Sequence, residues 1–359
     1  MKIGIPKEIK PQESRIAAVP AGVSQLVSDG HKVMVETGAG EAAGFSDSDF
    51  STAGAWIADT HEDIFAESEM IFKVKEPLPS EFDLIRSDHI IFTYFHFAAS
   101  LELTRAMQKT GALCAAYETL ELSDGSLPLL IPMSEIAGRM APQCGAVSLE
   151  KHMGGRGVLL GGVPGVEPAE VTVIGGGVAG ANAALIAAGM GAKVTILDIS
   201  IPRLRYLADI MPANVTTIFS IPPTIAQYCA QSDLVIGAVL IHGAPAPKLI
   251  NRDILRAMRP GSVFVDISVD QGGCSDTTRP TTHSKPTYIE EGVIHYAVAN
   301  IPGAVGRTST FALSNATLPW AQKIAGKGKE ILDDPAFGSM VNIHGGKILY
   351  PALKETFGE

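Results

Sequence analysis

The chain has 359 residues, of which 46% are hydrophobic and only 18% charged, against roughly 25% charged in an average globular domain. This length predicts two domains with a large core and excludes a disordered chain. A net charge of −10 and the lack of any Lys or Arg run make nucleic acid and anionic membranes poor partners. The four cysteines form no C-x-x-C pair, and the N-terminus carries no signal-peptide stretch. We therefore expect a reduced, cytoplasmic protein without a metal site.

The first third of the chain alternates apolar runs with helical stretches, the pattern of a parallel α/β sheet. The predicted strands are Lys2–Ile5, Lys32–Glu36, Met70–Lys75, Ile90–His96 and Ala112–Glu118. The predicted helices between them are Ala21–Ser28, Ser46–Ala53 and Leu101–Thr110. A longer helix then runs from Pro128 to about Lys151, and we interpret it as the hinge to a second domain.

A second series of strands begins after the glycine-rich segment Gly154–Pro164, which reads as a hairpin or an irregular loop. The predicted strands are Val171–Ile174, Lys193–Leu197, Leu234–Leu240, Val263–Ser268 and His295–Ala299. A helix at Ser309–Ala325 and a short hairpin at Gly345-Gly346 follow. Because this tail is too small to form a domain, we assign it to the first one. The fold prediction is thus two doubly wound, Rossmann-like α/β domains, 1–130 with 307–359, and 131–306.

One motif in the second series predicts a dinucleotide site. The strand ending at Ile174 runs into G-x-G-x-x-G and then a small-residue helix. Gly175 permits the tight turn, Gly177 lets the backbone approach a pyrophosphate, and Gly180 allows close helix packing. The helix N-terminus, including Val178 and Ala179, offers free N–H groups to the anion.

The next strand supports this interpretation because it ends in Asp198, about 20 residues further on, where an acid can accept hydrogen bonds from the ribose hydroxyls. Asp198 would repel a 2′-phosphate, so we predict NAD in preference to NADP. Arg203 and Arg205 lie nearby; they either touch a phosphate or are solvated helix residues.

Polar residues follow several predicted strands, and in an open parallel sheet ligands bind at those carboxyl ends. These residues are Lys75, His96, Glu118, Asp270 and Asn300. His96, on a strand face with Tyr94 and Phe92 by period 2, could move protons or be structural. Lys75 and the early Arg15 could hold a carboxylate, although Lys75 could also cap an exposed strand end. Asp270 is either a general base or a turn-capping carboxylate.

Several blocks of the sequence closely resemble the alanine dehydrogenase family, and together they span nearly the whole chain. They include GIPKEIKPQESRIAAVPAGV, IFKVKEP, TYFHFAAS, LPLLIPMSEIAGR, VTVIGGGVAG, VDISVDQGG and VANIPGAVGRTST. The resemblance implies reversible NAD-dependent oxidative deamination of L-alanine to pyruvate and ammonium. It also implies a homohexamer, with the substrate domain at 1–130 and 307–359, the NAD domain at 131–306, and the active site in the cleft between the domains.

The resemblance also implies residue roles. Arg15 and Lys75 would bind the substrate carboxylate or carbonyl, His96 and Asp270 would move protons, Tyr94 and Met133 would line the pocket, and Asn300 and Ile301 would lie against the nicotinamide. Further cofactor contacts would come from Ser134, Asp198, Arg203, Ser220, Val239, Leu240, Ile267 and Asp270. The family often has Met in place of Ile301 and Leu in place of Phe97, which bears on fine substrate preference.

Two other functions fit the same fold. An opine- or saccharopine-forming oxidoreductase would need a pocket for a second, larger amino acid. A non-catalytic NAD-binding module, like the soluble domain of proton-translocating transhydrogenase, would need no proton shuttle. The presence of Lys75, Tyr94 and His96 together favours the enzyme.

Overall fold

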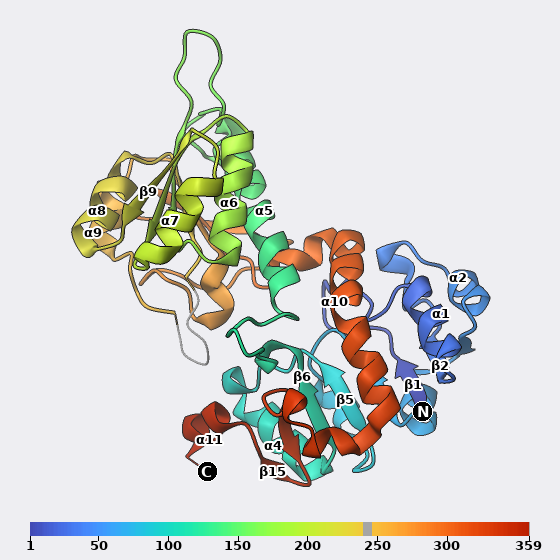
Figure 1. The fold of residues 1–359 in the computed structure, drawn as a ribbon. Helices are drawn as coiled ribbons and strands as arrows, with labels where there is room; N and C mark the ends of the chain where they lie inside the picture. The colour runs from blue at the N-terminus through green and yellow to red at the C-terminus, as the bar shows by residue number, and fades with distance from the viewer. Residues whose placement is uncertain (240–245, 359) are drawn as a thin grey trace. The chain divides into compact units, whose positions relative to one another are not determined.

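The computed structural model describes residues 1–239 and 246–358, and the chain divides into two compact units (Figure 1). Unit 1 comprises Met1–Met133 with Gly303–Glu359, and unit 2 comprises Ser134–Pro302. Each unit is a mostly parallel sheet with flanking helices, which confirms the predicted α/β fold class. None of the helices in the described part of the chain combines the length and apolar character that a membrane crossing needs.

The sheet of unit 1 has the strand order β15-β14-β6-β5-β4-β1-β2-β3. The strands β1 to β6 pair in parallel, whereas β14 and β15 are antiparallel to their neighbours. Strands β4, β5 and β6 are buried along their whole length, as expected for a parallel sheet covered on both faces. The bounds are β1 (Lys2–Ile5), β2 (Lys32–Glu36), β3 (Trp56–Ala58), β4 (Met70–Phe72), β5 (Ile90–Thr93), β6 (Leu113–Ala116), β14 (Val341–His344) and β15 (Lys347–Ile348).

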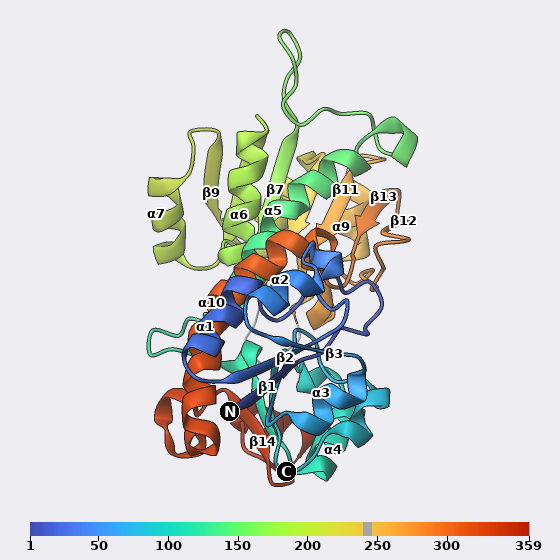
Figure 2. The same cartoon turned by 90° about the vertical axis from the view of Figure 1, so that its right-hand side faces the viewer.

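Helices cover both faces of this sheet, with α1 and α10 on one face and α3 and α4 on the other (Figure 2). Apolar side chains of α3, α4 and α11 pack against β4, β5 and β6 in one core cluster. Helix α4 begins at the Ser100 cap, whose hydroxyl accepts the Leu103 N–H, and ends at the left-handed Gly111. The bounds are α1 (Pro20–Ser28), α2 (Asp47–Thr52), α3 (His61–Glu67), α4 (Leu101–Thr110), α10 (Gly306–Lys327) and α11 (Pro351–Phe357).

The sheet of unit 2 has the order β12-β13-β11-β10-β7-β8-β9, parallel except for β12. Its parallel strands follow the order of a dinucleotide-binding fold, with the topological switch point between β7 and β10. The strands are β7 (Glu170–Ile174), β8 (Lys193–Asp198), β9 (Val215–Phe219), β10 (Leu234–Gly237), β11 (Val263–Asp266), β12 (Thr287–Glu290) and β13 (Val293–Tyr296). The helices are α6 (Val178–Gly189), α7 (Ile201–Ile210), α8 (Pro222–Gln231) and α9 (Arg252–Ala257), while α5 (Ile131–Ser148) belongs mostly to unit 2.

Several predicted strands are longer than the observed ones because the chain leaves the sheet before the predicted run ends and forms a 3-10 turn, as it does after β5, β6 and β11. Strand β5 ends at Thr93, and His96 has φ 53°, so the prediction that His96 lies on a strand face is wrong. Strand β11 ends at Asp266, whose carboxylate accepts the Ser268 N–H and starts a 3-10 turn. The predictions omitted several short elements, namely β3, α3, β9, α7, α8, α9, β12 and α11.

Candidate active site

The glycine loop of unit 2 connects β7 to α6. Gly175 has φ 98°, and a Cβ there would lie 2.5 Å from the Ala238 carbonyl oxygen. A Cβ on Gly180 would lie 1.8 Å from the Gly175 carbonyl oxygen, so the helix can approach the strand only because Gly180 has no side chain. Around Gly177, by contrast, no protein atom lies within 4 Å of a built Cβ. This space beside the N-terminus of α6, which has no side-chain cap, fits a pyrophosphate group.

Asp198 is the last residue of β8, and its carboxylate is tied into the glycine loop. Oδ2 accepts the Gly176 N–H at 2.7 Å, and Oδ1 accepts the Ser200 N–H at 2.7 Å. A carboxylate has about four acceptor positions, so Asp198 retains capacity for ribose hydroxyls. Arg203 donates from Nε to the Gly176 carbonyl at 2.6 Å and thereby braces the same loop.

The other residues expected to contact the cofactor all belong to unit 2. Val239 donates its N–H to Ser268 Oγ at 3.0 Å, and Ser268 Oγ donates to the Val239 carbonyl at 2.7 Å. The backbone N–H of Ser220 donates to the Asp198 carbonyl at 2.9 Å. Ser134 lies in α5, Ile267 and Asp270 lie in one 3-10 turn, and Asn300 and Ile301 precede α10. Leu240 lies outside the described residues.

The residues expected to bind substrate lie in unit 1, apart from Asn300, and most are buried. The exposed fractions are 3% for Arg15, 7% for Lys75, 3% for Tyr94 and 7% for Met133. Arg15 Nη1 lies 3.0 Å from Met133 Sδ. The Tyr94 hydroxyl donates to the Leu129 carbonyl, and burial raises the pKa of this phenol.

His96 sits in a left-handed turn directly after β5. Its ring stacks on Tyr94, with 5.8 Å between centroids and 7° between planes. The Glu118 carboxylate accepts the backbone N–H of His96 at 2.6 Å and that of Phe95 at 3.2 Å. A positive φ is uncommon for a residue with a side chain, and Glu118 stabilises it here. Sequence reasoning found Glu118 only as a strand-end carboxylate and gave it no role.

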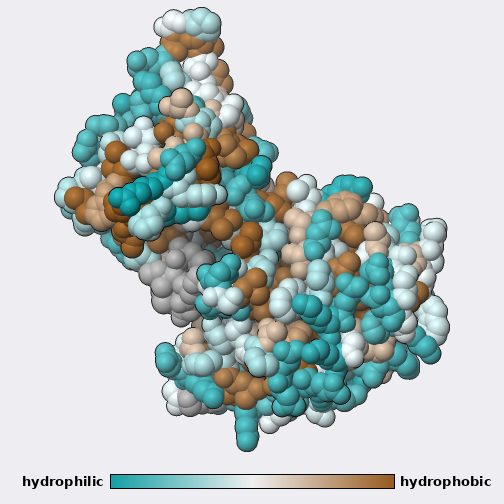
Figure 3. Space-filling view, in the orientation of Figure 1, coloured by the Kyte–Doolittle hydropathy of each residue, from teal (hydrophilic) through white to brown (hydrophobic). Residues whose placement is uncertain are grey.

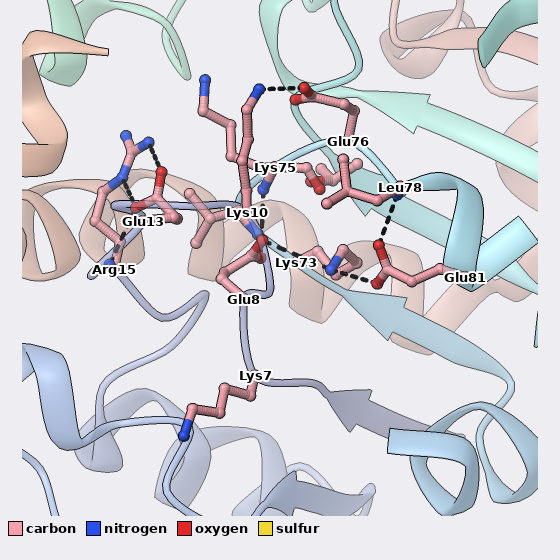
Figure 4. A network of polar contacts seen from close by, with 12 residues as sticks. Lys7, Glu8, Lys10, Glu13, Arg15, Lys73, Lys75, Glu76, Leu78 and Glu81 are labelled. Carbon is pink, nitrogen blue, oxygen red and sulfur yellow. Dashed lines mark hydrogen bonds and ion pairs between the residues drawn. The ribbon is translucent and has the colours of Figure 1, made fainter. Parts of the chain in front are cut away.

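Glu13 was missed by the sequence analysis although it makes the main contacts of Arg15 (Figure 4). Arg15 Nε donates to Glu13 Oε1 at 2.6 Å, and Nη2 donates to Oε2. Burial alone would raise the pKa of Glu13, but the hydrogen bonds and charge of Arg15, with the charge of Lys75, lower it. The signal in the sequence was an acid and a base two residues apart, Glu13 and Arg15.

A buried ionic network of Lys73, Glu8 and Glu81 lies next to the backbone of Lys75 (Figure 4). Lys73 Nζ donates to Glu81 at 2.7 Å and lies 3.6 Å from Glu8. Glu8 accepts the backbone N–H groups of Val74 at 2.6 Å and of Lys75 at 3.3 Å. The network therefore fixes the backbone from which the Lys75 side chain projects.

The His61 ring lies between two carboxylates at the other end of this network. Its Nδ1 is 2.7 Å from Glu36 Oε2, and its Nε2 is 3.1 Å from Glu81 Oε1. Burial lowers the pKa of His61, but the hydrogen bonds and charges of both carboxylates outweigh it and raise the pKa to about 9.

A cavity of about 100 Å³ in unit 1 is lined by Glu13 and Arg15 together with Glu8, Gly38 and Glu41. It shares only Arg15 with the expected substrate ligands, so we do not assign it to the substrate. Among the described residues, no group of three or more His, Cys, Asp or Glu side chains could hold a metal ion.

The strand order of unit 2, its glycine loop and the carboxylate that ends β8 define a dinucleotide-dependent oxidoreductase. Two protein-family models identify the family within this class of oxidoreductases. The model described as "Alanine dehydrogenase/PNT, N-terminal domain" matches residues 4–137, and the corresponding C-terminal domain model matches residues 141–351. The chain belongs to the alanine dehydrogenase/PNT family.

Similar proteins match over their full length. The alanine dehydrogenase of Halomonas elongata is 54% identical over 100% of this chain and 97% of its own, and that of Bacillus subtilis is 51% identical over 100% and 95%. A solved structure of L-alanine dehydrogenase has a TM-score of 0.96 at 48% identity and covers 100% of this chain and 99% of that one. A transhydrogenase from Sinorhizobium meliloti has a TM-score of 0.83 at 26% identity, covering 98% and 100%.

Proposed function

We propose that this chain catalyses the reversible, NAD-dependent oxidative deamination of L-alanine to pyruvate and ammonium. The observation that carries the proposal is full-length similarity, at about half of all positions, to proteins named alanine dehydrogenase. The buried cations of unit 1 and the glycine loop of unit 2 support it, because the reaction needs a carboxylate anchor and a dinucleotide site.

Arg15 and Lys75 bind the carboxylate and the carbonyl of the substrate in this proposal. Both are buried, so their charges act in a medium of low dielectric constant, where they attract an anion far more strongly than on the surface. Tyr94 and Met133 line the pocket for the alanine methyl group. Met133 touches Arg15 and Tyr94 stacks on His96, so each of these two side chains contacts a residue to which the proposal gives a role in binding or proton transfer.

When bound, NAD would supply the acceptor for the hydride that leaves Cα of alanine. Gly175, Gly177 and Gly180 would hold its pyrophosphate with the free N–H groups of α6, to which Val178 and Ala179 belong. Asp198 would accept hydrogen bonds from the ribose and repel the 2′-phosphate of NADP. Further contacts would come from Ser134, Arg203, Ser220, Val239, Leu240, Ile267, Asp270, Asn300 and Ile301.

His96 and Asp270 handle the protons of the reaction in this proposal. Loss of hydride and of an amine proton converts alanine to an imine, which then adds water and expels ammonia. A titratable imidazole in a fixed turn suits the proton transfers, and Glu118 fixes that turn. Asp270 is exposed and lies in the 3-10 turn Ile267–Gln271. Its exposure suits contact with water and the departing amine.

We further propose that unit 1 is the substrate domain, that unit 2 is the NAD domain, and that the protein is a cytoplasmic homohexamer. Apolar surface supports the assembly: Leu159, Val163 and Val166, which lie in one hairpin, are 66%, 53% and 63% exposed, and brown patches occur on the visible surface of unit 2 (Figure 3). Clusters of exposed apolar residues are typical of association surfaces.

NADH formation tests the proposal, with L-alanine compared against a panel of amino acids and NADP offered in place of NAD. We expect turnover of L-alanine with NAD, and a large loss of turnover with Lys75→Ala while NAD affinity stays within a few fold. Tight NAD binding without turnover of any amino acid would instead favour a non-catalytic carrier like the transhydrogenase domain.

A further inference from the structure

Glu13 covers one whole edge of the Arg15 guanidinium. The Arg15 Nε and Nη2 groups each donate to a different oxygen of the Glu13 carboxylate, and the Arg15 backbone N–H donates to Oε1 at 3.0 Å. Both side chains are buried, with 2% of Arg15 and 0% of Glu13 exposed. Such a two-point pair is the strongest arrangement available to these groups, so Glu13 stays in place when other anions approach.

This pairing has a geometric and an electrostatic consequence. The other edge of the guanidinium is formed by Nη1 and the second N–H of Nη2, and Nη1 lies 3.0 Å from Met133 Sδ. In the proposed function, the substrate carboxylate approaches Arg15 from this edge. The Glu13 charge also cancels one of the two cations, Arg15 and Lys75, expected at the substrate. Lys73 adds no compensating charge, because Glu8 and Glu81 already flank it.

We propose that Glu13 is a specificity-determining residue that restricts the site to substrates with a single carboxylate. This inference rests on the proposed function, since it assumes that Arg15 holds the substrate carboxylate. A second buried carboxylate needs a positive partner of its own. Glu13 occupies the edge of Arg15 that could serve a dicarboxylic oxo acid, and it repels the additional negative charge.

Competitive inhibition by propionate and malonate tests the proposal directly. The two acids share a three-carbon skeleton, but malonate carries a second carboxylate in place of the methyl group. We would measure inhibition constants against pyruvate at a pH where malonate is a dianion. We expect wild type to bind propionate more tightly than malonate. Glu13→Gln keeps the size of the side chain and removes its charge, so it should improve malonate binding relative to propionate by about tenfold or more.

Glu41→Gln is the matched control, because Glu41 lines the same cavity as Glu13 and lacks the two-point contact with Arg15. The ratio of the two inhibition constants should stay at the wild-type value in Glu41→Gln. An unchanged ratio in Glu13→Gln, or an equal change in Glu41→Gln, overturns the proposal. A merely structural role for Glu13 would weaken both inhibitors together and leave their ratio unchanged.

Two outcomes need a separate measurement: a Glu13→Gln variant that does not fold, and a wild type that shows no turnover. If Glu13→Gln does not fold, wild type alone decides, because tighter binding of malonate than of propionate contradicts the proposal. If wild type does not convert pyruvate and ammonium, the proposed function fails. Calorimetric binding of propionate and malonate to the NADH-loaded protein then still tests the role of Glu13 separately.

Discussion

Gly177→Ala should separate cofactor binding from folding. Gly177 has φ −64° in an extended conformation that other residues adopt, and no protein atom lies within 4 Å of the added Cβ. The methyl group should cause no clash, so the free energy of unfolding should fall by no more than about 1 kcal/mol, the cost of Ala in place of Gly at the N-cap of α6. The methyl group would occupy space that we assign to the pyrophosphate. Loss of one hydrogen bond to a charged group costs about 1.5–3 kcal/mol, which corresponds to a rise of about tenfold to a hundredfold in the NAD dissociation constant.

Two other glycines of α6 and its loop provide controls. Gly189→Ala also adds a methyl group in open space, but at the far end of α6, so it should leave NAD affinity unchanged and stabilise the helix by up to about 1 kcal/mol. Gly180→Ala should destabilise the fold itself, because its Cβ would clash with the Gly175 carbonyl at 1.8 Å. Denaturant unfolding and NADH fluorescence titration measure the two effects. Wild-type NAD affinity in Gly177→Ala would refute the assignment of this space to the cofactor.

Three further predictions concern single side chains. Asp198→Ala should weaken NAD binding and allow turnover with NADP. The ratio of kcat/KM for the two cofactors measures this change, and a wild type that uses both cofactors equally would contradict the role of Asp198. Glu118→Gln should lower kcat about tenfold or more and displace the pH profile of kcat, while NAD affinity stays unchanged. The reason is that the His96 turn loses charge-assisted hydrogen bonds. An unaltered pH profile would contradict this role of Glu118. His61 has a folded-state pKa of about 9, above its usual value, so its stabilising contribution is present below about pH 6.5 and is lost as the pH rises through about 9. The stability difference between wild type and His61→Gln in urea should shrink over that range, and a constant difference would refute it.

Elements with a strong local pattern were predictable from the sequence. Strands β1 and β2 and helix α4 have the predicted bounds, because apolar runs between turn residues leave little choice of register. The glycine loop and the position of Asp198 at the end of β8 were also predicted, because Gly175 and Gly180 each satisfy a local steric need that the structure makes visible.

Features that depend on tertiary partners were not predictable in the same way. The left-handed turn at His96 is stabilised by Glu118, which is distant in the sequence and gives no local signal. The pair of Glu13 with Arg15 could have been suspected from its spacing, but its burial depends on the packing of unit 1. Short edge elements such as β3 and β12 have weak patterns, because only one of their seven residues is buried.

The initial rate of NADH formation from L-alanine, compared between wild type and His96→Gln across pH, tests the central claim most directly. We expect wild type to oxidise L-alanine with NAD at a rate that depends on pH. His96→Gln should lose about a hundredfold or more of this rate together with the wild-type pH dependence, because an amide cannot accept and return a proton. A wild type without alanine-dependent NADH formation would contradict the proposed function, and a wild-type pH profile that persists in His96→Gln would assign the proton transfer to another group.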